Sequence, residues 1–562
     1  MTRPFPLDCP GPCVPIQASS RKPSSVCRFS LPPALAALLL TAYFLLALNR
    51  SLWRSLWPLF HGGDAGGPGF FLSLCLFLVC YLNLLFTLLL WPKAGKPVVC
   101  ALLVVSAAAA YFMDSYGVSL DRDMIENVFQ TNTSEAASLL TPALLWHVAV
   151  FGALPAALFA RLRLRHAPWR RGLLHKLAGV AATLLVAALL FGLSTKQYIY
   201  FARNHRDLYD RFNPYNYLSA TVRYARHALT DRDRPLQPLG TDAHLAAPPD
   251  PLHPTVVVLV VGETGRAQDQ GLQGYPRDTT PELAAAGVDY FTDAHSCGTA
   301  TAVSVPCMFS DLGRAHYRED KARDTENLLD VLRHAGVTVQ WRDNDNGCKG
   351  VCRRVPTEDL SDARIRGLCA DGDCLDDVLI RDLPARLAAL RKPALLVLHL
   401  KGSHGPAYYR RYTPAFRRFT PTCDTAEVQT CDHQAIVNTY DNTLLYTDHI
   451  LGTIIADLRA LPDTTDAALV YLSDHGESLG ENGIYLHGMD YRVAPPEQTH
   501  IPFLLWFSPA WKADHPAQAA CVASRRDRPV SQDNLFDTML GLFGVHTSVY
   551  RAALDLGHGC AD

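Results

Sequence analysis

Five long apolar segments in the first 200 residues constrain the fold of this chain more than any other feature. They cover residues 31–49, 69–91, 97–113, 142–160 and 173–193. A helix of about 20 residues crosses the roughly 30 Å hydrocarbon core of a bilayer, and each segment is close to that length. The sequence therefore predicts a helical membrane domain of five transmembrane helices over residues 30–193, of which the third and fourth are the shortest.

Basic residues lie on one side of the predicted spans. They occur in the tail 1–29, in the loop that holds Lys93 and Lys96, and five times as arginine between residues 161 and 171. In a five-span chain these stretches share one side of the membrane, which the distribution of Lys and Arg identifies as the cytoplasm. Everything after residue 193 is then expected outside. A cleaved signal peptide is not expected, because the first span lacks a clear small-residue cleavage site and further spans follow.

Two stretches beside the predicted spans suit the membrane interface. The segment 113–140 is polar, yet it places Met124, Val128 and Phe129 at helical spacing, which favours an interfacial helix over a plain connecting loop. Residues 196–227 interleave tyrosine with arginine. Both residue types are favourable at the level of the lipid headgroups, so a position at the membrane surface explains this composition more simply than nucleic-acid binding does. The Pro-rich stretch 230–254 has no period, so residues 194–254 are predicted to form an interfacial helix and a linker.

The cysteines after residue 290 are typical of a disulfide framework, because ten of the sixteen lie there at short spacings. The couples are Cys297 and Cys307, Cys348 and Cys352, Cys369 and Cys374, and Cys423 and Cys431, followed by Cys521 and Cys560, whose pairing the sequence leaves open. Disulfides indicate an oxidising compartment, which agrees with the orientation derived from the basic residues. A zinc site built on the turn 348–352 is the alternative.

Short apolar runs alternate with helical patterns beyond the linker. The runs 256–263, 337–343, 394–400, 467–474 and 501–508 predict buried strands. The stretches 324–336 and 439–461 predict helices between them. This alternation favours an α/β domain over residues 255–562 with a mostly parallel sheet. Ligands of such sheets bind outside the carboxyl ends of the strands.

Metal-ligating residue types follow the predicted strands. They are Glu263, His404, Asp474, His475 and, after a short loop, His487. Each alone could be an ordinary surface or ion-paired residue. Together, carboxylates and imidazoles at one edge of a sheet predict a site for Zn²⁺ or Mn²⁺.

The stretch Ser296–Cys307, SCGTATAVSVPC, offers a nucleophile for that site. It contains the hydroxyls of Thr299, Thr301 and Ser304 between two cysteines. A free alcohol is a poor nucleophile at neutral pH, but a metal ion lowers the pKa of an oxygen bound to it, so no adjacent histidine base is required. The alternative is a purely structural disulfide between the two cysteines, with threonines that have no catalytic role.

Six motifs resemble one known family closely. They are GETGRA (262–267), GYPRDTTPEL (274–283), SCGTATAVSVPCMFS (296–310), WRDNDNGCKGVC (341–352), GSHGPAYY (402–409) and SDHGESLGENGIYLHG (473–488). With the five spans and the interfacial segment, they are similar to the membrane-bound phosphoethanolamine transferases that modify lipid A, including the mobilised colistin-resistance enzymes. That family belongs to the alkaline phosphatase/sulfatase superfamily, so the resemblance implies the α/β fold of that superfamily.

The resemblance implies roles for residues of the catalytic domain. Thr301 would be the nucleophile that carries phosphoethanolamine. The ligands of a catalytic Zn²⁺ ion would be Glu263, Thr301, Asp474 and His475. The residues that contact substrate, hold phosphate or hold a second zinc ion would be His404, His487 and Lys349.

In the interfacial segment, the resemblance assigns the ethanolamine headgroup to Asn127, Thr131 and Glu135, and less directly to Tyr116 and Met124. The spacing i, i+4, i+8 puts the first three on one face of a helix. The Glu135 carboxylate suits a cationic ammonium group.

Two positions depart from the family pattern. Many relatives have Ala where this chain has Gly265, and Asp345 stands where close relatives often have Asn, so no role is carried over to Asp345.

The implied activity is a two-step transfer of phosphoethanolamine from phosphatidylethanolamine to a phosphate of lipid A. The resemblance implies a multi-pass protein of the bacterial inner membrane, with its catalytic domain in the periplasm, acting as a monomer. The net charge of −2 and the lack of a concentrated basic tract give no sign of a nucleic-acid partner.

Four other functions are alternatives for such a sequence. A transferase acting on core sugars of lipooligosaccharide, or a phosphoglycerol transferase, would share the same motifs. A sulfatase would need a Cys/Ser-x-Pro-x-Arg sequence, and the nearest stretch, beginning at Cys521, lacks the proline. A membrane receptor with a metal-stabilised outer domain would give Thr301 no purpose.

Overall fold

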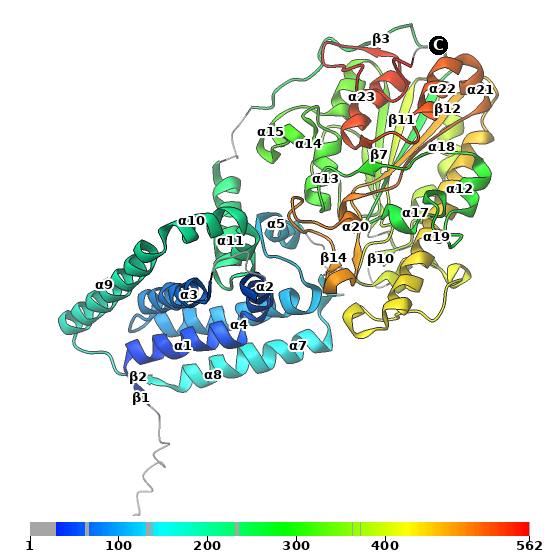
Figure 1. Ribbon diagram of the computed structural model, residues 1–562. Helices are drawn as coiled ribbons and strands as arrows, with labels where there is room; N and C mark the ends of the chain where they lie inside the picture. Colours follow the sequence, from blue (N-terminus) through cyan, green and yellow to red (C-terminus); the bar gives the residue numbers. More distant parts are fainter. Residues whose placement is uncertain are drawn as a thin grey trace, which may run out of the picture.

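The chain forms a bundle of helices beside a larger α/β domain (Figure 1). The structure is a computed structural model, and it describes residues 30–61, 67–130, 136–137, 139–230, 235–361, 363–370 and 373–560. The helices α5 and α11 lie between the bundle and the α/β domain.

The bundle contains the predicted spans. Its helices are α1 (Pro33–Ala47), α2 (Arg50–His61), α3 (Pro68–Leu89), α4 (Gly95–Tyr116), α7 (Pro142–Val148), the π-helix η1 (Ala149–Ala153), α8 (Leu154–Arg161) and α9 (Trp169–Leu193). The helix α5 (Arg122–Gln130) follows α4 and lies outside the bundle. Within the described residues, α3, α4, the continuous run 142–161 and α9 are each long and apolar enough to cross a membrane. A fifth span results if α1 and α2, bent by 70°, count as one broken span. The third span is longer than the sequence suggested.

The bend after α1 has a polar cause. Helix α1 ends close to the end of the predicted first span, 31–49, and the chain bends at Asn49, whose side-chain amide donates to the carbonyl oxygens of Phe44 at 3.0 Å and Asn213 at 2.8 Å. The Asn213 main-chain N–H donates back to Asn49 Oδ1 at 2.8 Å, and both side chains are buried. A buried amide that competes for helix carbonyls favours a helix end. The pair ties the first span to the segment after α9.

The basic segments meet at one end of the bundle. Strand β1 (Ser30–Leu31), which follows the tail, pairs with β2 (Arg163–Leu164) in the loop after α8. Lys96, in the first turn of α4, donates to the carbonyl oxygen of Ala160 at 3.2 Å. This end lies away from the α/β domain (Figure 1), as the distribution of basic residues predicted.

The chain leaves the bundle through α10 (Thr195–Asn204), η2 (Arg206–Arg211) and α11 (Tyr215–Thr230). The stretch expected as a linker is described from residue 235 onward, and there it lies against the α/β domain. The Glu326 N–H donates to the carbonyl oxygen of Gln237 at 2.9 Å. Strand β3 (His244–Leu245) pairs with β17 (Val545–His546).

The α/β domain is built on a seven-stranded sheet in the order β5-β15-β12-β4-β11-β7-β8. The strands are β4 (Thr255–Gly262), β5 (Asp289–Phe291), β7 (Thr338–Asp343), β8 (Thr357–Asp359), β11 (Ala394–His399), β12 (Asp466–Ser473) and β15 (Phe503–Phe507). Pairing is parallel from β12 to β8 and antiparallel on both sides of β15. The mostly parallel sheet is therefore confirmed.

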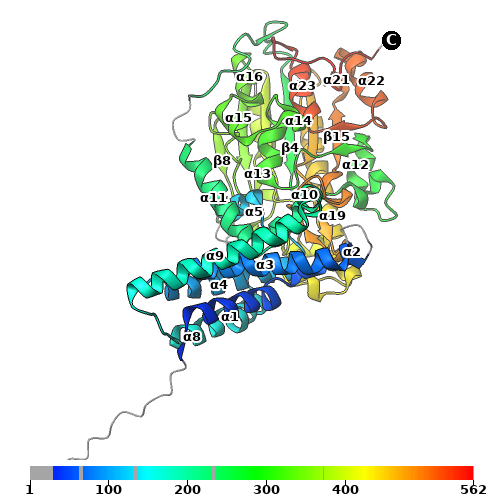
Figure 2. The ribbon, with the colours of Figure 1, turned by 60° about the vertical axis from the view of Figure 1, so that its left-hand side comes forward.

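Helices cover both faces of the sheet (Figure 2). They are α12 (Pro281–Ala286), α13 (Thr301–Met308), α14 (Gly313–His316), α15 (Glu319–Asp324), α16 (Leu328–His334), α17 (Asp377–Ile380), α18 (Leu383–Ala389), α19 (His433–Arg459), α20 (Pro496–Thr499), α21 (Pro509–Asp514), α22 (Pro516–Ser524) and α23 (Asp533–Leu542). Along β4, Val257, Leu259 and Val261 face the core under α16 and α23, while the alternate valines face α12 and α19. Burial on both faces explains the continuous apolar run of this strand.

The ten cysteines of the α/β domain form five disulfides. The pairs are Cys297–Cys307, Cys348–Cys352, Cys369–Cys374, Cys423–Cys431 and Cys521–Cys560. The disulfide framework inferred from the spacing is confirmed, and the one pairing that the sequence left open is now assigned.

We expect reduction to destabilise this domain, because each closed loop typically contributes about 2–4 kcal/mol. Alkylation of the unfolded, unreduced protein, followed by peptide mapping, should leave these ten cysteines unmodified. Labelling of all ten would contradict the framework and the oxidising compartment with it.

Candidate metal centre and nucleophile

Three of the predicted ligands converge because their strands are neighbours. Strands β4 and β12 run parallel with Gly262 opposite Ser473, so the residues that follow each strand emerge side by side. His475 Nε2 lies 3.2 Å from Asp474 Oδ2 and 3.7 Å from Glu263 Oε1. All three side chains are buried. The sequence prediction of a shared site at this edge of the sheet is matched by these positions.

Thr301 brings a hydroxyl to the same cluster from the first turn of α13. Its Oγ1 donates to Glu263 Oε2 at 3.1 Å and lies 3.4 Å from His475 Nε2. The hydroxyl of Thr299 instead donates to the carbonyl oxygen of Met489, and Ser304 is fully buried within α13. Of the three candidate hydroxyls, Thr301 is the one that faces the carboxylates.

The tautomer of His475 is set by its main-chain neighbour. Nδ1 lies 2.9 Å from the carbonyl oxygen of Gly476, which can only accept, so Nδ1 carries the proton. The lone pair of Nε2 is therefore directed at Asp474, Glu263 and Thr301. This is the arrangement by which proteins orient a histidine that binds metal.

The cluster has an excess of buried negative charge that fits a divalent cation. Burial, reinforced by the charge of Asp474, raises the pKa of Glu263 to about 8. Burial also raises the pKa of Asp474, whose Oδ2 accepts no hydrogen bond from the described residues. Burial lowers the pKa of His475 to about 4, so this imidazole is neutral and adds no positive charge. Two buried carboxylates, a neutral imidazole and a hydroxyl form a donor set that suits Zn²⁺.

A second pair of histidines flanks these ligands. The ring centroid of His487 lies 4.2 Å from that of His475 and 5.9 Å from that of His404. Glu263, His404 and His487 each offer a ligand atom within 4.8 Å of the others. Both histidines thus lie beside the proposed zinc ligands, and their contacts with substrate or a second zinc ion remain a prediction.

The two flanking histidines differ in charge. Burial alone would lower the pKa of His487, but the Glu477 carboxylate, 2.7 Å from its Nδ1, outweighs burial and raises that pKa to about 9. Burial, and then the charge of Lys401, holds the pKa of His404 well below its ordinary value. The site therefore presents one cationic and one neutral imidazole to an incoming phosphate.

Several buried residues of the site were not predicted from the sequence. His399, at the end of β11, has its Nδ1 3.1 Å from Asp343 Oδ2 and lies within reach of Glu263. The carboxylate of Asp345 lies 3.7 Å from Lys401 Nζ. Burial would raise the pKa of Asp345, but Lys401 and His399 hold it low, so it is a buried anion. The same strand-end rule that found Glu263 could have found these residues, since they follow β7 and β11.

A close approach of two loops fixes Glu263. Gly402 has φ +50°, and a Cβ placed on it would come within 2.6 Å of the carbonyl oxygen of Glu263. That carbonyl accepts from the Ser403 N–H at 3.0 Å, while the Lys401 and Gly402 N–H groups donate to Asp376. Only glycine allows both the left-handed backbone and this contact.

Gly402→Ala should therefore displace Glu263 and lower metal affinity by about tenfold or more, in addition to a stability loss of about 1–3 kcal/mol. Calorimetric titration of the metal-stripped variant with Zn²⁺ measures this. Gly287→Ala is the matched control, because Gly287 also has positive φ but no atom lies near its missing Cβ. Equal zinc affinity in the two variants would contradict this role of Gly402.

The remaining predicted contacts are divided between two places. Lys349 lies in the turn closed by Cys348–Cys352, and its Nζ donates to the carbonyl oxygen of Asn346 at 3.0 Å. On α5, Met124 packs against Gly488, next to His487, since a Cβ on Gly488 would lie 3.0 Å from Met124 Cε. Tyr116 is buried, with its hydroxyl 3.4 Å from the carbonyl oxygen of Ala426.

The predicted ethanolamine stripe is only partly described. Asn127 lies on α5 and is half-buried. Thr131 and Glu135 lie outside the described residues, so the helical stripe of Asn127, Thr131 and Glu135 remains a prediction.

The space around Gly265, where many relatives have Ala, is tight. A Cβ at this position would lie 3.1 Å from Ser473 Oγ, so an alanine requires a shift of a few tenths of an ångström.

Comparison with known proteins connects both halves of the chain to one group. A family model described as "Phosphoethanolamine transferase EptA/EptB" matches residues 78–229, and one described as "Sulfatase" matches residues 255–545. Phosphoethanolamine transferase EptA of Escherichia coli K12 is 41% identical over 94% of this chain and 97% of its own length. Phosphatidylethanolamine transferase Mcr-1 of Escherichia coli is 37% identical over 86% of this chain and 90% of its own length.

A solved structure shares the whole architecture. The integral membrane protein lipooligosaccharide phosphoethanolamine transferase A of Neisseria meningitidis superimposes with a TM-score of 0.89 at 37% identity. The match covers 94% of this chain and 98% of that one, so it includes both the helical bundle and the α/β domain.

Proposed function

The chain belongs to the phosphoethanolamine transferases, and on that premise we propose that it moves phosphoethanolamine from phosphatidylethanolamine to a phosphate of lipid A at the periplasmic face of the inner membrane. The product carries an added ammonium group, which lowers the negative charge of lipid A. Weaker binding of polymyxin-type cationic peptides would follow.

In the proposed first step, Thr301 Oγ1 attacks the phosphorus of the donor. The Thr301 O–P bond forms, the P–O bond to diacylglycerol breaks, and the proton of the hydroxyl ends on diacylglycerol. Glu263 Oε2, 3.1 Å from Oγ1, is placed to accept that proton first. The disulfide Cys297–Cys307 closes the loop that holds α13, so the nucleophile has little freedom to move.

In the proposed second step, an oxygen of a lipid A phosphate that carries one proton attacks the same phosphorus. The Thr301 O–P bond breaks, the proton of the attacking phosphate passes to Thr301 Oγ1, and the new P–O bond is a phosphoanhydride that joins lipid A to phosphoethanolamine. His487, kept cationic by Glu477, is placed to donate a hydrogen bond to a phosphoryl oxygen in both steps.

Glu263, Thr301, Asp474 and His475 would hold Zn²⁺, which supplies positive charge that stabilises the oxyanion of Thr301 and the charge on the phosphoryl group. The second zinc site that the resemblance allows would use Glu263, His404 and His487. Lys349, Asn127, Thr131, Glu135, Tyr116 and Met124 keep their proposed contacts with substrate.

The observation that carries the proposal is the position of Thr301 between Glu263 and His475 at the edge of the sheet. The donor is supported by the name of the Mcr-1 relative, a phosphatidylethanolamine transferase. The name of the Neisseria relative, a lipooligosaccharide phosphoethanolamine transferase, supports an acceptor within lipooligosaccharide, of which lipid A is the membrane anchor.

Mass spectrometry of lipid A and of core oligosaccharide, from cells with and without this protein, tests the function. We expect phosphoethanolamine on a lipid A phosphate only in cells that contain it. Phosphoethanolamine confined to core sugars would favour the core-sugar transferase, and phosphoglycerol in its place would favour a phosphoglycerol transferase. Either result would contradict the proposed acceptor or group.

A further inference from the structure

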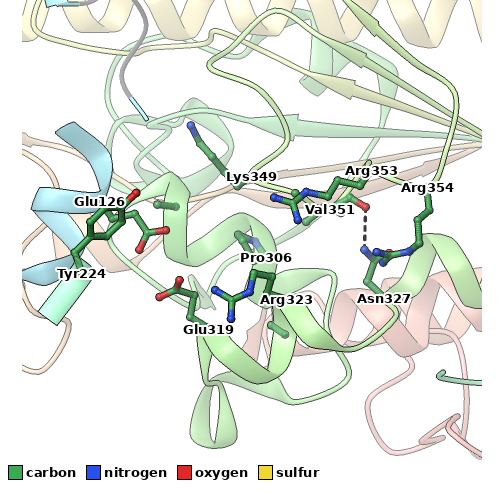
Figure 3. Close-up of a pocket in the computed structure, with 13 residues that line it drawn as sticks. Glu126, Tyr224, Pro306, Glu319, Arg323, Asn327, Lys349, Val351, Arg353 and Arg354 are labelled. Carbon is green, nitrogen blue, oxygen red and sulfur yellow. Dashed lines mark hydrogen bonds between the residues drawn. The ribbon is translucent and has the colours of Figure 1, made fainter. Parts of the chain in front are cut away.

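A cavity of about 370 Å³ opens beside the nucleophile helix, and none of the proposed metal ligands Glu263, Asp474 and His475 lines it (Figure 3). Its walls come from both parts of the protein. The α/β domain contributes Ala302 and Pro306 of α13, while α5 and α11 contribute Glu126 and Tyr224. Because Ala302 directly follows Thr301, the cavity and the nucleophile share one short helix. Its volume lies in the range of small-ligand sites, about 300–1,000 Å³.

Four basic side chains line this cavity: Arg323, Lys349, Arg353 and Arg354. Three of them come from the turn that Cys348–Cys352 closes and from the residues just after it. Lys349 and Gly350 have φ +49° and +89°, so the backbone of the turn is sharply folded. The Val351 carbonyl accepts from Asn327 Nδ2 at 2.9 Å and anchors the turn to the start of α16. Figure 3 shows the guanidinium groups of Arg323 and Arg353 facing one space.

The charges in the wall are only partly balanced. Of the two lining carboxylates, Glu126 lies 3.7 Å from Arg122 Nη2 and Glu319 forms an ion pair with the same arginine, which does not line the cavity. Arg354 is held by Asp330, 2.7 Å from its Nε, and Arg323 pairs with Asp324, 3.2 Å from its Nε. Arg353 is exposed and makes no ion pair within the part of the chain that the structure describes. The wall therefore keeps unused capacity for an anion.

We propose that this cavity binds the phosphate-bearing sugar headgroup of the acceptor lipid while Thr301 carries phosphoethanolamine. The proposal rests on the proposed transferase function and names where its second substrate docks. Arginine forks match phosphate oxygens in pairs, and Arg353 and Arg323 face the same space. The ring of Tyr224, which stacks on Phe129 with centroids 5.0 Å apart, offers an apolar face to a sugar.

Charge distinguishes the acceptor from the donor in this cavity. A phosphatidylethanolamine headgroup carries an ammonium group that a wall with four basic side chains disfavours. A phosphorylated sugar carries no compensating cation. The position between α5, α11 and the α/β domain also lets a headgroup reach α13 from the membrane surface.

The experiment separates the two half-reactions in Arg353→Glu. Vesicles of phosphatidylethanolamine and phosphatidylcholine, free of anionic lipid, are given to the full-length protein, and the adduct on Thr301 is followed by intact mass. The loaded protein then receives purified lipid A at a series of concentrations. We expect Arg353→Glu to form the adduct at the wild-type rate. Its KM for lipid A should rise by about tenfold or more, and its adduct should persist longer after lipid A is added. Arg353→Lys should recover part of the lost affinity for lipid A.

Arg366→Glu is the matched control, because Arg366 is exposed on the same domain and does not line the cavity. An unchanged KM for lipid A in Arg353→Glu would overturn the proposal. Slower adduct formation with an unchanged transfer to lipid A would also overturn it, because the cavity would then bind the donor. Failure of wild-type protein to form any adduct would instead overturn the proposed function. Equal melting temperatures of the variants show that both fold.

Discussion

Replacing Thr301 by alanine should abolish phosphoethanolamine transfer and leave the fold intact. The hydroxyl is the group that faces Glu263 and His475, and neither Thr299 nor Ser304 is directed at them. Alanine keeps the apolar packing of the side chain and the disulfide that holds α13. We expect transfer to fall by about 10³-fold or more, since no other hydroxyl can take over the covalent step.

Intact-mass measurement after incubation with phosphatidylethanolamine checks this prediction. Wild-type protein should gain one phosphoethanolamine group and Thr301→Ala none. Ser304→Ala is the matched control, because Ser304 lies on the same helix and its buried hydroxyl has no partner among the described residues. Persistent adduct in Thr301→Ala, mapped to Thr299 or Ser304, would move the nucleophile.

Stripping the metal should abolish transfer and make stability depend on pH in a direction unusual for a carboxyl group. Burial, together with the charge of Asp474, raises the pKa of Glu263 from 4.5 to about 8 when no cation is bound. Below about pH 4.5 the carboxyl is protonated in both the folded and the unfolded protein and has no effect. Between about pH 4.5 and 8 the unfolded carboxyl ionises while the buried one resists, so the free energy of unfolding falls as pH rises.

A bound divalent cation removes this penalty because it stabilises the ionised carboxylates. Thermal melts of the metal-stripped protein should therefore show a Tm that falls from about pH 5 to 8, and added Zn²⁺ should restore it most at the upper end. Each kcal/mol lost lowers Tm by about 1.5 °C in a domain of this size, since the entropy of unfolding is about 2.1 cal/mol/K per residue. Glu263→Gln is the control, since its stripped form should lack most of the slope. A stripped protein whose Tm rises over this interval would contradict the buried anionic cluster.

The ligands that directly follow a buried strand could be predicted from the sequence. Glu263, Asp474 and His475 come directly after apolar runs, and parallel neighbouring strands bring such residues together. Asp345 and His399 obey the same logic, but Asp345 had been set aside as a departure from the family pattern, and His399 closes its strand as part of the apolar run. Their place beside Glu263 depends on the strand order β4-β11-β7, which periodicity does not determine.

Contacts between distant segments could not be predicted. The bend after α1 depends on Asn49 meeting Asn213, which is 164 residues away in the chain. The basic cavity forms where α5 and α11 pack beside α13, so no role for Arg353 and Arg354 in KGVCRR (349–354) could be predicted from the sequence, although the resemblance implied one for Lys349. A stretch such as 235–254, rich in proline and without a period, gave no sign that β3 would pair with β17.

The most direct test of the account is a single-turnover chase. Full-length protein is loaded from phosphatidylethanolamine labelled with ¹³C in its ethanolamine, separated from donor, and mixed with lipid A. We expect the label to sit on the peptide containing Thr301, to leave it, and to appear on a phosphate of lipid A at the same rate. Label that remains on the protein, or lipid A that becomes labelled only when donor is still present, would contradict it.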